Sequence, residues 1–393
     1  MKNIKYTTKE WFRVIVILAL KIVLHIFWFV PIKRKLIIFN SYQGSQYSCS
    51  PKYLYKYFKD HFGDEFTYIW ILNSVNTHKD LENIKTIKFL SLKYFYYVCI
   101  CNVYITNVFV EPFIPKRNKQ IFINTWHGGG AYKGNSDVFM NNKAYIFKNK
   151  MRNKITNYYL ASCQAIIEAW VKDFNFEKYK FLPTGLPRND IFFNCTDNIK
   201  DNVKTAIGLE RNKKVLLYCP TWRYLGRNQS ENIDINFNIR EILMVAKERF
   251  GNDFIFLFRG HHCMKDMVID DCNIIDVSNY SDMQEILLIT DFMINDYSSS
   301  QWDYALSNKP GLLYVPDLEE YEKFQHFFTP IKDWPYDLAF TPKELIEKIK
   351  NYNEKKSKLK IEAHLSKLGN FDKGMACKLV ADMILKEITD DNN

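Results

Sequence analysis

Short β-rich runs alternate with helical stretches twice along this chain, and this alternation constrains the fold more than any other feature of the sequence. Strands separated by helices form parallel sheets that are covered on both faces. We therefore predict an α/β protein with two doubly wound, Rossmann-like domains that face a cleft. The strand candidates are 36–40, 66–72, 103–107, 121–125, 158–162 and 180–184 in the first series, and 215–219, 254–259, 273–276, 292–295 and 311–315 in the second. Helical stretches between them include 51–62, 91–100, 237–250, 281–290 and 299–306.

The length of 393 residues is too great for one ordinary core and fits this two-domain pattern. We assign residues 1–35 to a membrane-associating N-terminal segment, 36–200 to the first Rossmann-like domain and 201–393 to the second. The boundary between the two domains is expected in the polar stretch 194–214, and the part from Pro342 onward is expected to form helices.

The N-terminal segment is an apolar tract surrounded by cations. Residues 14–20 and 22–30 are apolar apart from His25, and Lys21 separates the two parts. No small-residue cleavage site follows, so we expect no removed signal peptide, and the uninterrupted stretch is shorter than the ~20 residues of a spanning helix. We expect a helix in the membrane interface, with its rings in lipid and its cations at anionic headgroups. A buried first helix and a single span are the alternatives. The flanking cations are Lys2, Lys5, Lys9, Arg13, Lys33, Arg34 and Lys35, with Glu10 as the lone acid.

The composition narrows the class of partner. A net charge of +10 suits phosphate-rich partners such as anionic lipid, an anionic polymer or nucleic acid. No zinc-finger, RNP-type or basic-zipper pattern is present, so we expect no nucleic acid. The nine cysteines are scattered, which is typical of free thiols in a reducing compartment. We therefore expect a peripheral protein on the cytoplasmic face of the cell membrane, and no His–Cys group has the spacing of a metal site.

A histidine followed by three glycines ends the strand candidate 121–125. The glycines at 128–130 allow a ligand to approach the backbone closely and present N–H groups to an anion. His127 is the side chain of this loop that can exchange a proton near neutral pH. The chain has only 14 glycines, so three consecutive glycines are unexpected in a flexible loop without a function.

Four other strand ends carry groups that can hold phosphate. Arg188 can bind a phosphate with two parallel hydrogen bonds. The serines before the helical stretch 299–306 can form an anion pocket with the first N–H groups of that helix, and Asp303 lies about one turn beyond Ser299 on the same face. A solvated turn, a buried tryptophan, a chance histidine pair and simple N-capping are the alternative interpretations of single motifs. The motifs are GLPRND at 185–190, YCPTWR at 218–223, RGHH at 259–262 and NDYSSS at 295–300.

Together these motifs resemble the CDP-glycerol glycerophosphotransferase family, whose members prime and polymerise teichoic acids and related capsule polymers. The motifs occur in the family's order over roughly residues 124–323, and the match is strongest over 276–323. The resemblance implies a GT-B-like fold in which the first domain binds the acceptor and the second binds the CDP-polyol. The implied catalytic residues are His127 and His261, and the implied substrate-binding residues are Trp126, Gly128, Gly129, Gly130, Arg188, Pro220, Thr221, Trp222, Arg259, Gly260, Ser298, Ser299 and Asp303.

The sequence departs from the family pattern at one informative place. The family usually has Thr-Pro after His-Gly, whereas this chain has Gly129 and Gly130. We expect these glycines to loosen the loop, and they leave the acceptor and the polyol open. The long helical tail of some polymerising members is absent, so the layout is more similar to a primase or a short capsule enzyme.

The reaction implied is the transfer of glycerol-phosphate from CDP-glycerol to a hydroxyl of a lipid-linked wall teichoic acid or capsule acceptor, with release of CMP. His127 would take the hydroxyl proton, since an imidazole pKa of roughly 6.5 suits cellular pH. No cofactor is expected; Mg²⁺ stays open but no motif supports it. The alternatives are a CDP-ribitol ribitolphosphotransferase, a GT-B nucleotide-sugar glycosyltransferase and a membrane-surface adaptor without catalysis.

Overall fold

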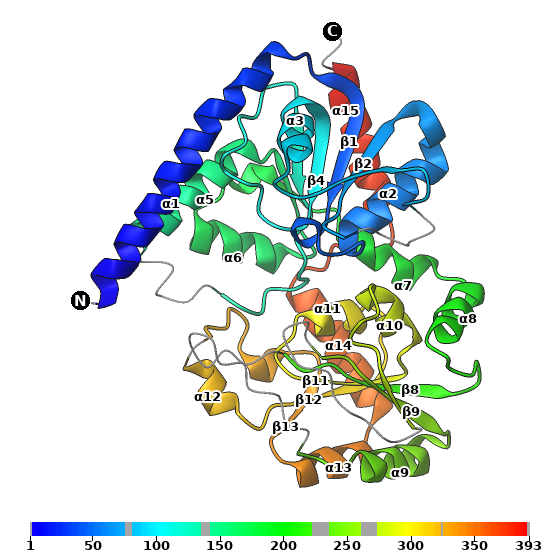
Figure 1. The fold of residues 1–393 in the computed structure, drawn as a ribbon. Helices are drawn as coiled ribbons and strands as arrows, with labels where there is room; N and C mark the ends of the chain where they lie inside the picture. The colour runs from blue at the N-terminus through cyan, green and yellow to red at the C-terminus, as the bar shows by residue number, and fades with distance from the viewer. Residues whose placement is uncertain are drawn as a thin grey trace. The chain divides into compact units, whose positions relative to one another are not determined.

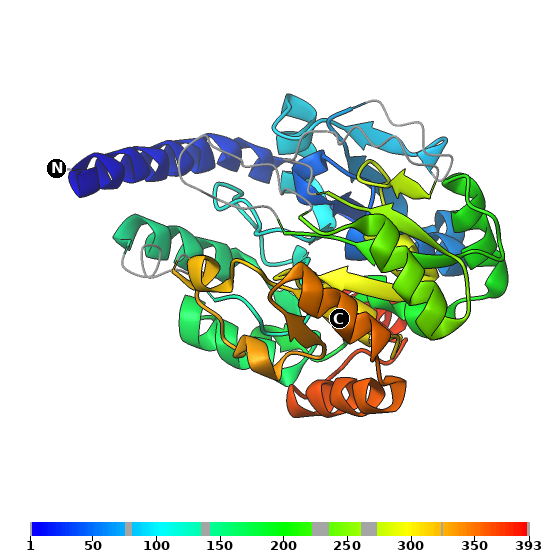
Figure 2. The same ribbon diagram turned by 90° about the horizontal axis from the view of Figure 1, so that it is seen from below.

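The computed structural model describes residues 2–74, 81–134, 142–221, 236–260, 273–323 and 325–390. The chain forms two compact units, which are drawn in Figures 1 and 2. The chain enters unit 2 briefly from Gly129 to Lys133, within the run of three glycines, and it returns to unit 1 for its last helix. Unit 1 comprises Met1–Gly128, Gly134–Asp190 and Phe371–Asn393, and unit 2 comprises Gly129–Lys133 and Ile191–Asn370.

Unit 1 is built on a parallel sheet with the strand order β3-β2-β1-β4-β5-β6-β7. The central strands are continuous buried runs, as expected where helices cover both faces of a parallel sheet. The strand order reverses between β1 and β4, so their carboxyl ends lie at a topological switch point, where doubly wound sheets bind ligands. The strands are β1 (Lys33–Asn40), β2 (Thr67–Ile71), β3 (Lys85–Ile87), β4 (Cys101–Thr106), β5 (Ile121–Asn124), β6 (Tyr158–Leu160) and β7 (Phe181–Leu182).

Helices cover both faces of this sheet (Figure 1). On one face, Phe58 of α2 and Ile384 of α15 belong to the same core. On the other face, Leu24 of α1 and Val98 of α3 belong to a second core, to which α5 also contributes. The helices are α1 (Lys2–Leu24), α2 (Cys49–Phe62), α3 (Leu92–Ile100), α5 (Lys143–Ile155), α6 (Gln164–Phe174) and α15 (Ala376–Asp390), and the 3-10 helices are η1 (His25–Phe29), η2 (Tyr42–Gly44), η3 (Gly63–Glu65), η5 (Lys178–Lys180) and η6 (Pro187–Asp190).

Unit 2 repeats the same construction with the strand order β10-β9-β8-β11-β12-β13. Its core includes Ile242 of α9 and Leu345 of α13, which pack on the sheet. The strands are β8 (Lys214–Tyr218), β9 (Phe254–Phe258), β10 (Ile274–Asp276), β11 (Phe292–Asn295), β12 (Gly311–Tyr314) and β13 (Asp337–Ala339). The helices are α7 (Ile191–Asn194), α8 (Asp197–Ala206), α9 (Ile239–Phe250), α10 (Met283–Ile289), α11 (Ser300–Ala305), α12 (Leu318–Glu322), α13 (Pro342–Lys350), α14 (Glu354–Lys367) and the 3-10 helix η7 (Ile331–Asp333).

Both sheets are parallel and doubly wound, which confirms the predicted α/β, GT-B-like fold class. In unit 2 the order reverses between β8 and β11, so this unit has its own switch point. The loops that carry the predicted motifs follow the carboxyl ends of these strands. The polar groups of the motifs in each unit therefore lie along one edge of its sheet.

The N-terminal helix packs along unit 1 with one side only. Val14 and Leu24 are buried, at 2% and 4% exposure, whereas most other apolar residues from Lys9 to the end of α1 are exposed. The stretch Lys9–Phe29 is long and apolar enough to cross a membrane by length and composition, which is weak support on its own. A single span therefore stays an alternative to a helix in the membrane interface.

Candidate active site

The histidine loop leaves β5 through a strained turn. The side-chain Oδ1 of Asn124 accepts a hydrogen bond from the backbone N–H of Trp126 at 2.8 Å. Trp126 has a φ of 55°, a left-handed conformation that is uncommon for a bulky side chain. Its indole lies 4.6 Å from the Trp170 ring and 4.1 Å from the His127 ring, measured between centroids. This aromatic packing holds the costly backbone conformation and so fixes the direction in which His127 leaves the sheet.

The ring nitrogens of His127 have different environments. Nδ1 lies 2.7 Å from the backbone carbonyl oxygen of Asn107, the residue after β4. A carbonyl oxygen only accepts, so Nδ1 carries the proton and donates it. The other ring nitrogen, Nε2, then keeps its lone pair. The described geometry therefore defines the tautomer that a general base needs.

The protonation state of His127 differs from the simple expectation. The residue as a whole is half-buried, and protein atoms surround its imidazole closely. Burial lowers the pKa of His127 to about 4; the hydrogen bond to Asn107 opposes this change, and the charge of Arg188 adds to it. The imidazole is therefore neutral throughout the cellular pH range, rather than half-titrated near pH 6.5.

Arg188 supports the same loop from η6. The side chain is 4% exposed, and its NH1 donates to the backbone carbonyl of His127 at 2.7 Å. The same nitrogen lies 3.5 Å from Sγ of Cys49, the first residue of α2. Sequence reasoning predicts a phosphate contact for Arg188, and the structure places the guanidinium directly against the His127 backbone.

Asn107 is a site residue that sequence reasoning did not single out. It is fully buried, and its Oδ1 accepts from the backbone N–H of Tyr42 at 2.8 Å. Its Nδ2 donates to Oγ of Ser41 at 3.3 Å. Asn107 thus ties the loops after β1 and β4 together at the switch point while its carbonyl holds His127. The available signal was its place as the polar end of the predicted strand 103–107.

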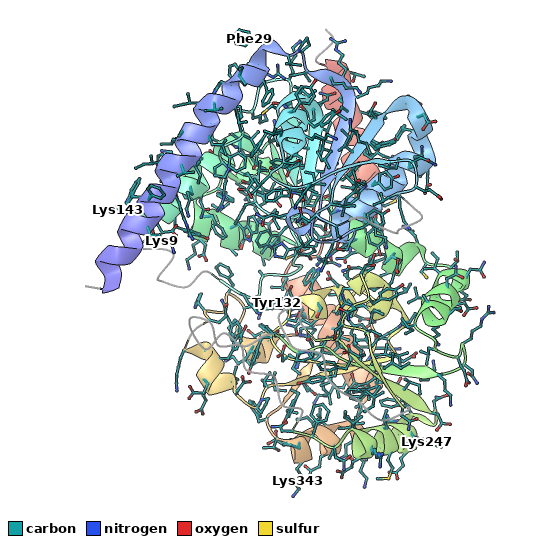
Figure 3. All side chains as sticks on the ribbon, viewed as in Figure 1. Lys9, Phe29, Tyr132, Lys143, Lys247 and Lys343 are labelled. Atoms are coloured by element: carbon teal, nitrogen blue, oxygen red, sulfur yellow. The ribbon has the colours of Figure 1, made fainter. Side chains whose placement is uncertain are left out.

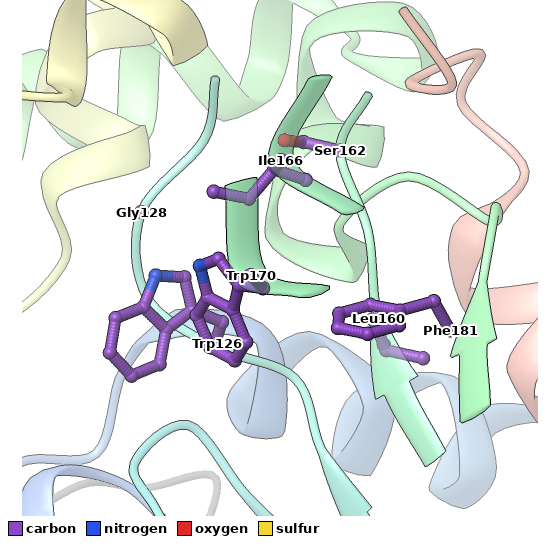
Figure 4. Close-up of a pocket in the computed structure, with 7 residues that line it drawn as sticks. All are labelled: Trp126, Gly128, Leu160, Ser162, Ile166, Trp170 and Phe181. Carbon is purple, nitrogen blue, oxygen red and sulfur yellow. The ribbon is translucent and has the colours of Figure 1, made fainter. Parts of the chain in front are cut away.

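A small pocket lies beside the histidine loop in unit 1 (Figure 4). Trp126 and Trp170 lie close together on one side of it, and Leu160 and Phe181 lie together on another. Its described lining has a serine hydroxyl but no charged side chain, so it does not have the chemistry of a phosphate site. The lining residues are Trp126, Gly128, Leu160, Ser162, Ile166, Trp170 and Phe181.

The two glycines after Gly128 belong to unit 2 and are tightly packed there. A Cβ on Gly129 would lie 2.1 Å from Cδ1 of Trp302. Gly130 has a φ of +67°, a conformation that favours glycine, and a Cβ there would lie 2.5 Å from the Tyr132 ring. The expectation that these glycines loosen the loop is therefore wrong: the Trp302 indole occupies the space that larger side chains would need.

Asp296 joins the ends of β8 and β11 at the switch point of unit 2. It is 1% exposed, and its carboxylate oxygens accept from the backbone N–H of Thr221 at 2.9 and 2.8 Å. The Thr221 hydroxyl donates to Oδ1 at 2.7 Å. Pro220 precedes Thr221 and is buried. Pro220 and Thr221, two of the predicted substrate-binding residues, are thus held rigidly just after the carboxyl end of β8.

The serine motif begins α11 with a local network. The backbone N–H and the hydroxyl of Ser300 both donate to Oγ of Ser298, at 3.3 and 3.0 Å. Within the described part of the chain, Ser299 makes no side-chain capping hydrogen bond, and it keeps part of its surface accessible, as does Ser298. Asp303 is 2% exposed, and its Oδ2 accepts from Nε2 of Gln284 at 3.1 Å. Asp303 therefore lies inside unit 2, against α10.

The end of β9 is fastened to the loop after β10. NH1 of Arg259 donates to the backbone carbonyls of Val277 and Tyr280 at 2.9 and 2.8 Å. The backbone N–H of Gly260 donates to Oγ of Ser278 at 2.8 Å. These hydrogen bonds hold Arg259 and Gly260 in defined positions at the carboxyl end of β9.

The predicted site residues fall into two groups, one in each unit. The unit 1 group surrounds the imidazole, and the unit 2 group surrounds the switch point of β8 and β11. Two predicted residues, Trp222 and His261, lie outside the described residues. The unit 1 group is Trp126, His127, Gly128 and Arg188, and the unit 2 group is Gly129, Gly130, Pro220, Thr221, Arg259, Gly260, Ser298, Ser299 and Asp303.

Comparisons with known proteins show which family the whole chain resembles. The chain is 30% identical over 352 residues to the teichoic acid poly(glycerol phosphate) polymerase of Bacillus subtilis (strain 168), which covers 84% of this chain and 46% of that protein. It is 29% identical over 398 residues to the Bacillus spizizenii protein of the same name, with 95% and 98% covered. It is 26% identical over 371 residues to the teichoic acid glycerol-phosphate transferase of Staphylococcus aureus, with 90% and 93% covered. The chain thus spans about half the length of some relatives, such as the Bacillus subtilis protein, and nearly all of others.

Solved structures of the wall teichoic acid polymerase TagF share the fold. One TagF structure, 25% identical, has a TM-score of 0.79, with 100% of this chain and 99% of that chain covered. A second, of a histidine variant soaked with CDPG, has a TM-score of 0.82 at 24% identity, with both chains covered completely.

A family model decides the assignment. The model described as CDP-Glycerol:Poly(glycerophosphate) glycerophosphotransferase matches residues 22–386. This match confirms the resemblance seen in the motifs, and it extends well beyond residues 124–323. The chain belongs to the CDP-glycerol:poly(glycerophosphate) glycerophosphotransferase family.

Proposed function

We propose that this protein transfers glycerol-phosphate from CDP-glycerol to a hydroxyl of a teichoic acid acceptor and releases CMP. The family model and the glycerol-phosphate relatives from Bacillus spizizenii and Staphylococcus aureus, which this chain matches over nearly their whole length, support this reaction. The related TagF variant soaked with CDPG supports the donor. Ribitol-phosphate enzymes are also among the relatives, at 25–27% identity, whereas the two Bacillus glycerol-phosphate polymerases are 30% and 29% identical, so glycerol is the favoured polyol.

The proposed reaction is a displacement at the β-phosphorus of CDP-glycerol. The acceptor oxygen forms a bond to that phosphorus, and the bond from the phosphorus to the bridging oxygen breaks, so that CMP takes the electron pair. Nε2 of His127 accepts the acceptor's proton as the new bond forms. A low pKa makes the imidazole of His127 a weaker base, but it keeps the imidazole neutral, and so able to accept a proton, at cellular pH.

Unit 2 supplies the groups that we assign to the donor. The carboxyl ends of β8, β9 and β11 carry Thr221, Arg259 and the serines that open α11. Cationic and hydroxyl groups at such strand ends stabilise the charge that spreads over a transferring phosphoryl group. Buried Asp303 of α11 would orient this helix and the serines before it through its hydrogen bond from Gln284 of α10, rather than contact the polyol directly.

The observation that carries the proposal is the hydrogen bond from Nδ1 of His127 to Asn107, which leaves Nε2 as the basic atom. The test is turnover of His127→Ala with CDP-glycerol and a lipid-linked glycerol-phosphate primer, together with calorimetric binding of CDP-glycerol. We expect turnover to be lost while the donor still binds. His61→Ala is the matched control, because His61 is an exposed histidine on α2 of the same unit.

Two results would contradict the proposal. Near-normal turnover of His127→Ala would remove the assigned base. Release of CMP from CDP-ribitol but not from CDP-glycerol, or of UDP or GDP from nucleotide sugars, would replace the donor. The same incubation therefore decides among glycerol-phosphate, ribitol-phosphate and sugar transfer.

We also infer that the protein binds the cytoplasmic face of the membrane through α1. The outer side of α1 carries apolar side chains between the labelled residues Lys9 and Phe29 (Figure 3). Its inner side packs on unit 1, so a helix that keeps this packing lies along the bilayer rather than across it. The exposed large apolar residues are Trp11, Phe12, Ile15, Val16, Leu18, Ile22 and Val23 in α1, with Ile26, Trp28 and Phe29 in η1.

Helix α5 extends this apolar surface. Ile146 and Phe147 of α5 are 51% and 37% exposed, and the Phe147 ring lies 6.1 Å from the Trp11 ring of α1. Nζ of Lys148 contacts Oε2 of Glu10 at 2.6 Å and fastens the two helices together. The two helices therefore offer one continuous face on which rings and aliphatic chains can enter lipid.

Exposed basic side chains follow this apolar surface directly in the sequence. Lys33, Arg34 and Lys35 follow η1 closely and are exposed, and each can gain about 1 kcal/mol near an anionic leaflet. Flotation with phosphatidylglycerol vesicles tests the inference, with phosphatidylcholine vesicles as the neutral comparison. We expect Phe12→Glu to reduce flotation and Met244→Glu, an exposed residue of α9 in unit 2, to leave it unchanged. Equal flotation of both variants would contradict the inference.

A further inference from the structure

The loop that follows β1 in unit 1 begins with a strained turn, η2. Tyr42 and Gln43 have φ values of 47° and 55°, and Gly44 has a φ of 82°. This left-handed conformation is easy for glycine but uncommon and costly for a tyrosine or a glutamine. Backbone strain of this kind persists only where the surrounding structure holds it, and it is concentrated at functional sites. The strain in η2 therefore points to a role beyond the connection of β1 to α2.

Two neighbouring segments of unit 1 hold this turn by hydrogen bonds. Oδ1 of the fully buried Asn107, after β4, accepts from the backbone N–H of Tyr42 at 2.8 Å. Nδ2 of Asn73, after β2, donates to the backbone carbonyl of Gln43 at 2.8 Å. The backbone N–H of Asn73 donates to the carbonyl of Gly44 at 2.7 Å. The turn is thus fixed against the ends of two strands in spite of its strained backbone.

The turn brings the half-buried Tyr42 ring to the imidazole of His127. The centroids of the two rings lie 5.6 Å apart, with an angle of 58° between the ring planes. Trp126 gives the imidazole a second aromatic neighbour, at 4.1 Å between centroids. Asn107 is bonded to both partners, since its carbonyl lies 2.7 Å from Nδ1 of His127 while its side chain accepts from Tyr42. All four residues belong to unit 1.

We propose that Tyr42 is a positioning residue for the transfer reaction: its ring restricts the orientation of the His127 imidazole and shields it from water. The proposal rests on the proposed role of His127 as the base. The hydrogen bond to Asn107 fixes Nδ1, which is one atom of the ring, whereas contacts along the ring itself are needed to fix the direction of Nε2. A misplacement of about 1 Å can cost on the order of 100-fold in rate.

Loss of the Tyr42 ring would also change the hydration of the imidazole. Burial is the main cause of the low pKa of His127, and the charge of Arg188 in η6 adds to it. The Cys49 thiol of α2 lies 3.5 Å from NH1 of the same guanidinium. With these groups kept and water admitted, the pKa of His127 should rise from about 4 toward its ordinary value near 6.5. The better hydrated imidazole is a stronger base, so it offsets part of the rate that misplacement costs.

The test compares substitutions of Tyr42 in the full-length protein. Tyr42→Gly removes the ring and also the left-handed strain, so the turn can keep its conformation. We expect its kcat at pH 8, where the imidazole is neutral in every variant, to be lower by about tenfold, with the calorimetric affinity for CDP-glycerol unchanged. Tyr42→Asn is a second variant without the ring, because asparagine also tolerates this conformation. Tyr97→Ala is the control and should keep the wild-type kcat, because Tyr97 is a half-buried tyrosine of α3 whose ring packs on Tyr96.

A conservative variant and a spectroscopic measurement separate positioning from a general loss of structure. Tyr42→Phe keeps the ring, so it should retain a higher kcat than Tyr42→Gly. The nitrogen-15 shifts of His127 should show a titration midpoint that is higher by at least about one pH unit in Tyr42→Gly, and unchanged in Tyr42→Phe.

Three results would overturn the proposal. The first is a wild-type kcat in the folded variants without the ring, and the second is an unchanged His127 midpoint in these variants. The third is an equal loss of kcat in Tyr42→Phe, which would assign the effect to the hydroxyl rather than to the ring. Absence of glycerol-phosphate transfer by the wild-type protein would instead overturn the proposed function.

Discussion

Gly129 offers a direct test of the packing that surrounds the candidate site. We predict that Gly129→Ala destabilises unit 2, because the new Cβ would lie 2.1 Å from Cδ1, 2.7 Å from Cγ and 3.0 Å from Nε1 of Trp302. The shortest of these contacts is about 1.4 Å inside the separation at which two carbons attract best. Trp302 is fully buried, so its ring cannot simply swing into solvent.

The size of the effect follows from the cost of overpacking. Inserting a methyl group into a filled core costs about 1–3 kcal/mol, and we expect the upper end because several ring atoms must move together. For a unit of this size, such a loss lowers Tm by about 10 °C. Thermal and urea unfolding followed by tryptophan fluorescence would measure it.

Two further variants separate the packing against Trp302 from other effects of the added methyl group. Gly208→Ala adds a methyl group in open space, at a φ of +72°, so it should cost only the about 1–2 kcal/mol of left-handed strain. In a Trp302→Ala background, the penalty of Gly129→Ala should nearly disappear, which gives a large coupling energy in a double-mutant cycle. A loss of stability for Gly129→Ala no larger than that for Gly208→Ala, or one that persists without Trp302, would show that packing against the Trp302 ring is not its cause.

Three other outcomes follow from the same structure. Because burial lowers the pKa of His127 to about 4, kcat/KM should not fall as pH decreases through 6.5 and should be lost only nearer pH 4; a pH–rate profile checks this. His364 also has a pKa of about 4, mainly through burial, whereas the unfolded chain protonates this group near pH 6.5. Neutral His364 therefore contributes stability above pH 6.5, of the order of 3 kcal/mol, that is lost as the pH falls toward 4. The free energy of unfolding of His364→Gln, measured in urea, should decline less than that of the wild type over this pH range. Arg188→Lys removes the fixed guanidinium that donates to the His127 carbonyl, so kcat should fall while calorimetric binding of CDP-glycerol is kept.

The sequence predicted the fold because buried parallel strands leave a clear pattern. The apolar runs that become β1, β4 and β5 are recognisable to within a few residues of their ends. The short strands β3 and β13 leave no such pattern, because three-residue runs such as Lys85–Ile87 carry too little apolar character. Placing polar motifs at strand ends was informative for the same reason, since parallel strands bring their carboxyl ends to one edge.

Other features depend on contacts that no local pattern encodes. The return of α15 to unit 1, where Ile384 packs in the same core as Phe58, requires knowledge of which helix covers which sheet face. The pairing of Tyr132 with His364 joins residues separated by most of unit 2. The low pKa of His127 also arises from burial, which a motif does not report.

The proposed role of His127 requires a neutral imidazole with its proton on Nδ1 and an electron pair on Nε2 that can accept a proton. The nitrogen-15 chemical shifts of His127, in protein labelled at histidine, report both the charge and the tautomer of this ring. We expect the Nδ1-protonated neutral tautomer at pH 7, with no titration until the pH falls well below 6. An imidazolium at pH 7, or a proton on Nε2, would contradict it.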